Sequence, residues 1–375
     1  MAAEKNNKTL NVPTLRFPEF SGEWERFRNC TLFKVISEKN KNYEFSTVLS
    51  ASQTEGMVLR DSLGIDIKFE EDSIKTYKIV RNGDYVAHLR SFQGGFAFSD
   101  KTGVCSPAYT ILRPSETISY GFLKPYFMSR KFIDSLRIVT YGIRDGKSIS
   151  VEEWLKLYTC IPKANEQEKI SKFLKLINER IETQKKVIED LKKLKYAISQ
   201  RLFENHTHSD FVSLGMVADI YQPRTIPTSW LKDTLPYPVY GANGLIGKYS
   251  EYNHENSQIC VACRGNTCGI VNYSEPKSWI TGNAMVINTD RFDINKRFLF
   301  HQLCIANFSS LISGSGQPQI VRTPLEKMKI WLPDESVQKR IATLLDALND
   351  RVLIKESVLG LIEKAKQYLL FQIFI

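Results

Sequence analysis

The sequence lacks the segments that mark secreted and membrane proteins. It has no run of about 18 apolar residues that could cross a bilayer. Its first residues, MAAEKNNKTLN, have no apolar core of a secretory signal. The seven cysteines form no even framework, which favours free thiols in a reducing compartment. We therefore expect a cytoplasmic protein without a membrane partner.

Motifs for catalysis are also missing. There is no Asn or Asp followed by Pro-Pro-Tyr or Pro-Pro-Phe, the tetrapeptide with which an adenine methyltransferase holds a flipped base. The stretch GANGLIGK is not a phosphate loop, because five residues separate Gly241 from Gly247 where that loop has four, and Tyr249 replaces the Ser or Thr that would meet magnesium. The five histidines form no constellation. We expect no catalytic residues in this chain.

A zinc site is suggested only weakly. Cys260, Cys263 and Cys268 lie close together with His254 nearby, but no second pair of ligands follows. Cys260 and Cys263 differ by an odd number, so on one strand their side chains face opposite ways. Buried thiols in a hairpin are therefore expected, and no metal.

The overall composition is that of a folded protein. Apolar residues make up 42% and charged residues 25% of 375 residues, which indicates two or more globular domains. The net charge of +10 favours a polyanionic partner such as nucleic acid, although an ordinary basic protein fits it too.

An internal repeat is the most specific feature. The stretch IPKANEQEKI returns as LPDESVQKRI, and one offset of 171 positions aligns both copies for over forty residues. The matching pairs include Pro162 with Pro333, Gln167 with Gln338, Ile170 with Ile341 and Phe203 with Phe374.

Each copy predicts a long helix, over about 166–203 and 337–374. A proline before each copy bars helix upstream. Asn165 has capping-box spacing to Glu168, and Ser336 can cap the second helix in the same place.

Apolar side chains step by four and three along both predicted helices, which is typical of a coiled-coil seam. Gln184 and Lys195, like Lys355 and Lys366, interrupt the seam at matching positions and help to fix its register. The alternative is that each helix packs only on its own domain, but a rod of about 57 Å is longer than a small domain. The predicted seam consists of Ile170, Leu174, Ile177, Ile181, Ile188, Leu191, Ile198, Leu202, Ile341, Leu345, Leu348, Val352, Leu359, Ile362, Leu369 and Ile373.

A globular block precedes each helix, and the two blocks do not align in sequence. Runs such as TYKIV and YVAHL in the first, and QICVAC and AMVIN in the second, read as strands between glycine-rich turns. The fold class is therefore α+β, with two mixed, β-rich domains separated by two long helices in an antiparallel coiled coil of pseudo-twofold arrangement.

This order resembles the specificity subunit of type I restriction-modification systems. The resemblance rests on LRFPEFSGEWERF, IPKANEQEKISKFL, SGSGQPQI and LPDESVQKRIATLL and covers essentially the whole chain. It implies two target recognition domains, each reading half of a bipartite DNA site, and helices that set the spacing. It divides the chain into an N-terminal segment 1–24, target recognition domains 25–160 and 206–331, and spacer helices 161–205 and 332–375.

The resemblance also implies partners and cofactors. The chain would bind double-stranded DNA, two methyltransferase subunits and the nuclease/translocase subunits, without catalysing a reaction itself. S-adenosylmethionine, ATP and Mg²⁺ are expected in those partner subunits and none in this chain. The alternative is a coiled-coil adaptor whose two domains bind protein.

Candidate DNA contacts are chosen from polar, glycine-punctuated loops. Arg264, Asn266 and Thr267 sit at the expected tip of a hairpin, and arginine and asparagine make the bidentate contacts that separate guanine from adenine. A solvated turn is the alternative. The full set is Arg90, Gln93, Lys101, Arg144 and Lys147 in the first domain, and Asn243, Lys248, Arg264, Asn266, Thr267, Gln317, Gln319 and Arg322 in the second.

Overall fold

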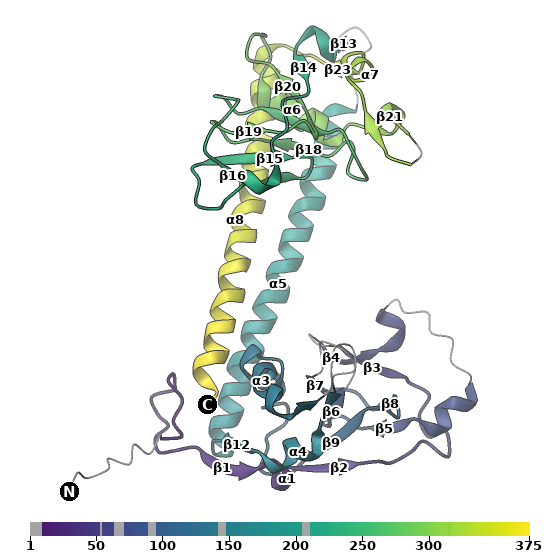
Figure 1. Cartoon of the computed structure of the whole chain (residues 1–375), viewed down its shortest axis with the longest axis vertical. Helices are drawn as coiled ribbons and strands as arrows, with labels where there is room; N and C mark the ends of the chain where they lie inside the picture. The colour runs from purple at the N-terminus through teal and green to yellow at the C-terminus, as the bar shows by residue number, and fades with distance from the viewer. Residues whose placement is uncertain are drawn as a thin grey trace, which may run out of the picture. The chain divides into compact units, whose positions relative to one another are not determined.

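A computed structural model describes residues 10–52, 55–63, 71–88, 95–141, 148–204, 211–314 and 316–375. The chain divides into two compact units (Figure 1). The first unit comprises residues 1–183 and 358–375, and the second comprises residues 184–357. Each unit therefore holds one sheet-rich domain and a stretch of two long helices.

The two long helices are α5 (Ala164–Phe203) and α8 (Glu335–Ile373). In the first unit the start of α5 packs against the end of α8, and in the second unit the end of α5 packs against the start of α8 (Figure 1). The pairing is thus antiparallel in both units, and the predicted fold class is confirmed. No helix in the described ranges is long and apolar enough to cross a membrane.

The side chains along the seam between these helices are shielded from solvent in both units. Each of the sixteen predicted seam residues is buried or half-buried. In the second unit, polar side chains also cross it, because Gln184 Nε2 donates to the Lys355 carbonyl at 3.0 Å and Lys195 Nζ donates to Asn349 Oδ1 at 2.6 Å. These pairs favour one register of the two helices, because a shift of one helix along the other would leave the Gln184 amide and the Lys195 ammonium without these hydrogen-bond partners.

The predicted helix caps are wrong. The helices begin at Ala164 and Glu335, so Asn165 and Ser336 lie inside the first turn. The backbone N–H groups of residues 166 and 167 donate to the Lys163 carbonyl, and those of residues 337 and 338 donate to the Asp334 carbonyl. Each helix therefore starts directly after the residue that follows its proline.

A repeated glutamine accounts for these early starts. Gln167 Nε2 donates to the Pro162 carbonyl at 2.8 Å, and Gln338 Nε2 donates to the Pro333 carbonyl at 2.7 Å. Each side-chain carbonyl then accepts a backbone N–H from its own domain, that of Ser119 or that of Asn295, both at 2.8 Å. The repeated Pro-x₄-Gln spacing clips each helix to the domain that precedes it.

Both domains contain the same four-stranded antiparallel sheet, although their sequences do not align. The strand order is β2-β9-β6-β7 in the first domain and β14-β20-β17-β18 in the second. These strands are β2 (Phe33–Ile36), β9 (Thr110–Pro114), β6 (Tyr85–His88), β7 (Gly95–Phe98), β14 (Asp219–Tyr221), β20 (Ala284–Asn288), β17 (Ile259–Ala262) and β18 (Val271–Tyr273).

The smaller strands follow the same plan. In the first domain β3 (Leu49–Ser52) pairs with β4 (Gly56–Leu59), β5 (Lys78–Val80) pairs with β8 (Gly103–Cys105), and a parallel bridge joins Val48 to Val104. In the second domain β15 (Tyr237–Gly241) pairs with β16 (Gly244–Tyr249) and runs parallel to β19 (Trp279–Ile280). The repeat seen in the helices thus extends to the domains at the level of fold.

A two-stranded ribbon closes the base of each domain. β1 (Glu25–Arg28) pairs with β12 (Tyr158–Ile161), and β13 (Phe211–Ser213) pairs with β23 (Lys329–Trp331), so the chain returns to the start of the next helix. The hairpins β10 (Thr140–Tyr141) with β11 (Ser148–Ile149), and β21 (Ile312–Ser313) with β22 (Gln319–Ile320), occupy equivalent places in the chain order. The short helices are α1 (Asn29–Leu32), α2 (Lys124–Phe127), α3 (Arg130–Ser135), α4 (Val151–Lys156), α6 (Lys296–Ile305) and α7 (Arg322–Glu326).

Each sheet is buried on both faces. In the first domain alternate residues of β6 enter two cores, since Tyr85 faces one and Val86 the other. In the second domain Ile259 and Cys260 divide in the same way. Because strands need only this alternation, their sequences diverge while the fold stays the same.

Candidate nucleic-acid interface

Two loops of the second domain are joined into one tip. The first follows β17 and covers residues 263–270, and the second is the turn of the β21–β22 hairpin. Gly265 N donates to the Pro318 carbonyl at 2.9 Å, and Ile320 N donates to the Cys263 carbonyl at 3.0 Å. An isolated antiparallel bridge joins Arg264 to Gln319. Backbone hydrogen bonds therefore hold the two loops in one arrangement.

Two thiols, those of Cys268 and Cys263, form hydrogen bonds at this tip. Cys268 Sγ donates to the Pro318 carbonyl at 3.2 Å, and Gln222 Nε2 donates to Cys263 Sγ at 3.0 Å. Cys260 packs in a different core from Cys263, so the two thiols face opposite sides of the sheet. Burial raises the pKa of Cys260 to about 12. Among the residues with described positions, no three His, Cys, Asp or Glu side chains gather to hold a metal ion.

The tip presents unpaired polar groups to solvent. Arg264, Asn266, Gln317 and Gln319 are exposed, and Thr267 is half-buried. Within the described ranges no carboxylate or carbonyl accepts from the Arg264 guanidinium. Gly265 has φ of +78° and nothing within 4 Å of the place where a Cβ would stand, so the turn is open on its outer side. A guanidinium and three amides on one fixed tip can make the bidentate contacts that distinguish bases.

One exposed basic residue, Arg224, was not predicted; it lies two positions after Gln222, whose side chain contacts Cys263 of the tip. Gln222 Nε2 donates to Cys263 Sγ and, at 3.2 Å, to the Gly282 carbonyl. These two hydrogen bonds hold the segment that follows β14 against Cys263. Gly282 lies so close to this segment that a Cβ would come 2.7 Å from the Pro223 carbonyl oxygen. Arg224 follows, exposed and without an ion pair to any described residue. It was missed because QPRTIP contains no glycine; a basic residue bracketed by prolines after a strand was the available signal.

The remaining candidates of the second domain are not equivalent to one another. Asn243 is exposed in the β15–β16 turn, which leans on β18 because Asn272 Nδ2 donates to the Ala242 carbonyl at 3.3 Å. Lys248 lies near the far end of β16 from this turn. Arg322 begins α7 and already pairs with Glu326 at 2.6 Å.

In the first domain, four candidates lie outside the described residues: Arg90, Gln93, Arg144 and Lys147. Their positions in the chain can still be compared. Arg90 and Gln93 fall between β6 and β7, as Arg264 and Asn266 fall between β17 and β18. Arg144 and Lys147 fall between β10 and β11, as Gln317 falls between β21 and β22. These four candidates therefore fall in connections equivalent to those that hold Arg264, Asn266 and Gln317.

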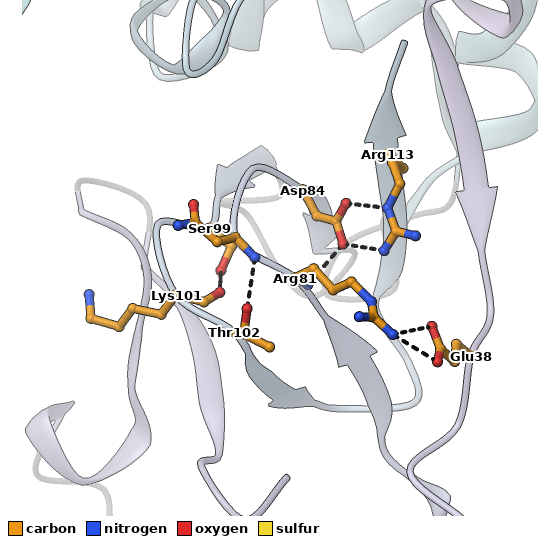
Figure 2. A network of polar contacts seen from close by, with 8 residues as sticks. Glu38, Arg81, Asp84, Ser99, Lys101, Thr102 and Arg113 are labelled. Carbon is orange, nitrogen blue, oxygen red and sulfur yellow. Dashed lines mark hydrogen bonds and ion pairs between the residues drawn. The ribbon is translucent and has the colours of Figure 1, made fainter. Parts of the chain in front are cut away.

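Lys101 lies apart from that connection, at the other end of β7. Its ammonium pairs with Asp100 at 2.8 Å, and its backbone carbonyl accepts from Ser99 Oγ at 2.7 Å. The neighbouring turn contributes Asn82, whose N–H donates to Thr102 Oγ1 at 3.1 Å. Figure 2 shows these loops with the polar network that surrounds them.

This network fixes the turn at residues 81–84, RNGD, and pairs its charged side chains with others in the same domain. Arg113 Nε and Nη2 donate to the two Asp84 oxygens at 2.9 and 3.0 Å, and the Arg81 N–H donates to the same carboxylate at 2.9 Å (Figure 2). The Asp84 side chain is 2% exposed, and its hydrogen bonds raise the pKa of Arg113. Arg81 also pairs with Glu38. Each of the three basic side chains here is thus paired with a carboxylate: Arg113 with Asp84, Arg81 with Glu38 and Lys101 with Asp100.

The chain thus holds two domains with one common sheet order, each in a unit with a stretch of two paired long helices. Residues 208–364 match the family described as "Type I restriction modification DNA specificity domain". The chain is 32% identical over 115 residues to a putative type I restriction enzyme specificity subunit of Haemophilus influenzae. It is 30% identical over 110 residues to the type I restriction enzyme EcoprrI specificity subunit of Escherichia coli.

These alignments are partial. They cover 30% and 29% of this chain, and 29% and 27% of those two relatives. The whole fold is similar to the crystal structure of a type I restriction-modification S subunit from M. genitalium, with a TM-score of 0.63, 15% identity and coverage of 97% of this chain and 99% of that one. The predicted resemblance to the specificity subunits of type I restriction-modification systems is therefore confirmed, and the chain shares the fold of such a subunit.

Proposed function

We propose that this chain is the non-catalytic DNA-recognition subunit of a type I restriction-modification complex. Each domain reads one half of a bipartite, asymmetric DNA site, and the paired helices set the spacing between the halves. The observation that carries this proposal is the joined tip of the second domain, where Arg264 and three amides are exposed on loops held by backbone hydrogen bonds. A rigid tip loses little entropy when it enters a groove of the duplex.

The shared sheet supports two readers of one kind. Equivalent connections carry Arg90 and Gln93 in one domain and Arg264 and Asn266 in the other. The residues differ between the domains, so the two half-sites differ in sequence. Arg224 joins the candidate set of the second domain.

The helices are also the docking sites of the two methyltransferase subunits. On the part of α8 in the first unit, Leu361 and Tyr368 lie seven residues apart and are 66% and 64% exposed, with Val358 at 36%. This spacing is that of a heptad face outside the one toward α5. A helix of a methyltransferase subunit fits such a face.

Specificity subunits are generally non-catalytic, and this chain follows that rule. The methyltransferase subunits bind S-adenosylmethionine, and the nuclease/translocase subunits bind ATP and Mg²⁺. The sequence offers neither a flipped-base tetrapeptide nor a Walker loop of its own.

The test is to express the chain with the methyltransferase encoded beside its gene and to map methylated adenines genome-wide. We expect one bipartite motif with unlike halves, and preference of the purified complex for that duplex over a scrambled competitor. Methylation without a motif, or equal binding to both duplexes, would leave the adaptor function as the explanation.

A further inference from the structure

The N-terminal segment fills a groove of the helix pair in the first unit. Residues 13–18 lie against the start of α5 and the end of α8, and the space that remains is about 150 Å³. The groove is lined on the helix side by Glu166, Ile170, Phe173, Leu369 and Ile373. It is thus a docking place for an extended peptide, built from the helices themselves.

Three contacts anchor that segment. Leu15 N donates to the Gln372 carbonyl at 3.1 Å, so its backbone is tied to the last turn of α8. Arg16 pairs with Glu166 at 2.7 Å, and the Glu166 side chain is only 3% exposed. Burial of that carboxylate makes the arginine necessary at this position.

Aromatic and charged contacts continue along the segment. Phe17 packs edge-on against Phe173, with ring centroids 5.6 Å apart. The Lys169 ammonium lies 4.7 Å from the Phe17 ring centroid and also pairs with Glu19. The residues that follow Leu15 are thus a basic residue, an aromatic residue, a proline and an acidic residue, Arg16 to Glu19.

The offset of 171 positions carries the groove residues into the second unit. Glu166 becomes Val337, Ile170 becomes Ile341, Phe173 becomes Leu344, Lys169 becomes Arg340 and Ile373 becomes Leu202. All five of these counterparts line one groove of the second unit, together with Arg201, Trp331, Lys339 and Thr343. Its volume is about 890 Å³.

The chain has no counterpart of residues 13–18 to place there. Residues 10–24 precede β1, but only seven residues, 204–210, connect the end of α5 to β13. Among the residues that the structure describes, the second groove is lined by α5, α8 and Trp331.

The chemistry of the second groove selects its occupant. Arg201 and Arg340 are exposed, and in the described part of the chain neither guanidinium forms an ion pair, whereas Lys339 pairs with Glu335. Val337 replaces the buried acid Glu166, so an apolar side chain fits where the first groove takes Arg16. Arg340 stands where Lys169 covers Phe17, a position for a cation over an aromatic ring.

We propose that this groove binds an extended segment of a partner polypeptide, with an apolar side chain, then an aromatic residue and proline, then a carboxylate. The aromatic ring lies on Leu344 under Arg340, and the carboxylate pairs with Arg340 or Arg201. The proposal goes beyond DNA recognition and depends only on the helix pair and Trp331.

The probe is a fluorescent peptide, VPTLLFPEF, which copies residues 12–20 with leucine in place of Arg16. Fluorescence anisotropy on the full chain measures its binding. We expect L344E and R340E each to weaken binding by about tenfold or more, which corresponds to about 1.4 kcal/mol. A peptide with lysine in place of its glutamate restores binding to R340E.

The matched control is L353E, because Leu353 is 51% exposed on the same helix but does not line the groove. It should bind the peptide as the wild type does. Absence of binding to the wild type, or equal binding by wild type, L344E and L353E, overturns the proposal. Neither result touches the DNA proposal, because the assay contains no DNA.

A photo-crosslinker at position 344 identifies the occupant in the complex with the methyltransferase. A crosslink to a segment of that partner with the stated pattern supports the proposal. A crosslink to residues 205–210 of the same chain, a crosslink to a second copy of the chain, or no crosslink at all overturns it.

Discussion

The two domains share a sheet and a glutamine clip, but they are attached to the helices by different chemistry. In the first unit the attachment is aromatic: Phe374, 3% exposed, packs against Trp24, Phe122 and Tyr126. Its equivalent in the second unit, Phe203, is only half-buried, between Phe298 and Trp331. A duplicated frame can therefore keep its geometry while the contacts that hold each domain diverge.

Charge replaces part of this aromatic packing in the second unit. Asp346 of α8 accepts from Arg297 Nε at 2.8 Å and from His301 Nε2 at 2.7 Å, both on α6. Burial alone would raise the pKa of Asp346, but these hydrogen bonds outweigh it and the pKa is lowered. Arg297 also lies over the rings of Tyr273 and Phe300. The carboxylate thus stays ionised between two donors.

The largest expected effect separates the two phenylalanines. Phe374→Ala removes a fully buried ring and should lower the free energy of unfolding of the first unit by about 3 to 5 kcal/mol. Phe203→Ala should cost the second unit less, because its ring is half-buried and its neighbours can relax. Urea unfolding of the full chain, followed by hydrogen exchange resolved by peptide, measures both. Equal losses in the two units would contradict the difference in attachment.

The glutamine clip provides a smaller, matched comparison. Gln167→Leu leaves the Ser119 N–H and the carbonyls of Thr117 and Pro162 without their partner, at a cost of about 1 to 3 kcal/mol. Gln338→Leu removes two hydrogen bonds rather than three and should cost less.

The same unfolding experiment measures these two variants, with Gln200→Leu as control because Gln200 Nε2 donates to Tyr196 on the same helix and to no other residue that the structure describes. A neutral result for both variants would mean that the clip does not contribute to the helix starts.

The helix pair was predictable because its signals are local and repeated. Apolar residues at steps of four and three, and one offset through the whole helix, require no knowledge of distant residues. The helix starts were not predictable, because the side chain of Gln167 is held by Ser119, 48 positions away. Capping rules compare neighbours in sequence and selected Asn165 instead.

The domains show the same limit. β-Rich runs between turns predicted strands, but many sequences satisfy that pattern, so the common sheet order could not be predicted. Glycine-rich, polar loops selected Arg264, whose loop is now tied to the β21–β22 turn, yet they also selected Lys101, at the opposite end of its strand. Arg224 follows Gln222, whose side chain contacts Cys263 and Gly282, residues 41 and 60 positions away in sequence.

A third comparison concerns the two candidate reading loops. Arg264→Ala should weaken binding of the complex by about 1 to 3 kcal/mol and relax one position of one half-site if Arg264 contacts a base. Arg90→Ala should do the same in the other half-site only. If either contacts phosphate, binding falls equally on all duplexes and the salt slope decreases by about one unit.

Titrations on the cognate duplex, single-base variants and random duplex at several salt concentrations distinguish these outcomes. Lys101→Ala is the control, and it should leave both half-sites unchanged because Lys101 lies at the other end of β7. A change in both half-sites from one substitution would contradict independent readers.

The smallest expected effect is the contribution of His301 to the pH dependence of the second unit. Burial lowers the pKa of His301, although its hydrogen bond to Asp346 opposes this, while Arg297 and Lys195 act with burial. The native state therefore stays neutral where the unfolded chain, with an ordinary pKa near 6.5, already binds a proton. Stability is fully present above about pH 6.5 and declines below it, by at most about 1.4 kcal/mol per pH unit for one proton.

His301→Gln keeps a donor for Asp346 but cannot titrate, so the slope of the second unit between about pH 5 and 6.5 should become shallower. It should not vanish, because burial also lowers the pKa of His254 in the same unit. His88→Gln is the matched control, since burial lowers the pKa of His88 in the first unit. Hydrogen exchange at several pH values should show each substitution altering only its own unit. If His301→Gln left the second unit's slope unchanged, its attachment through Asp346 would be independent of the imidazole, and Arg297 alone would hold α6 on the helices.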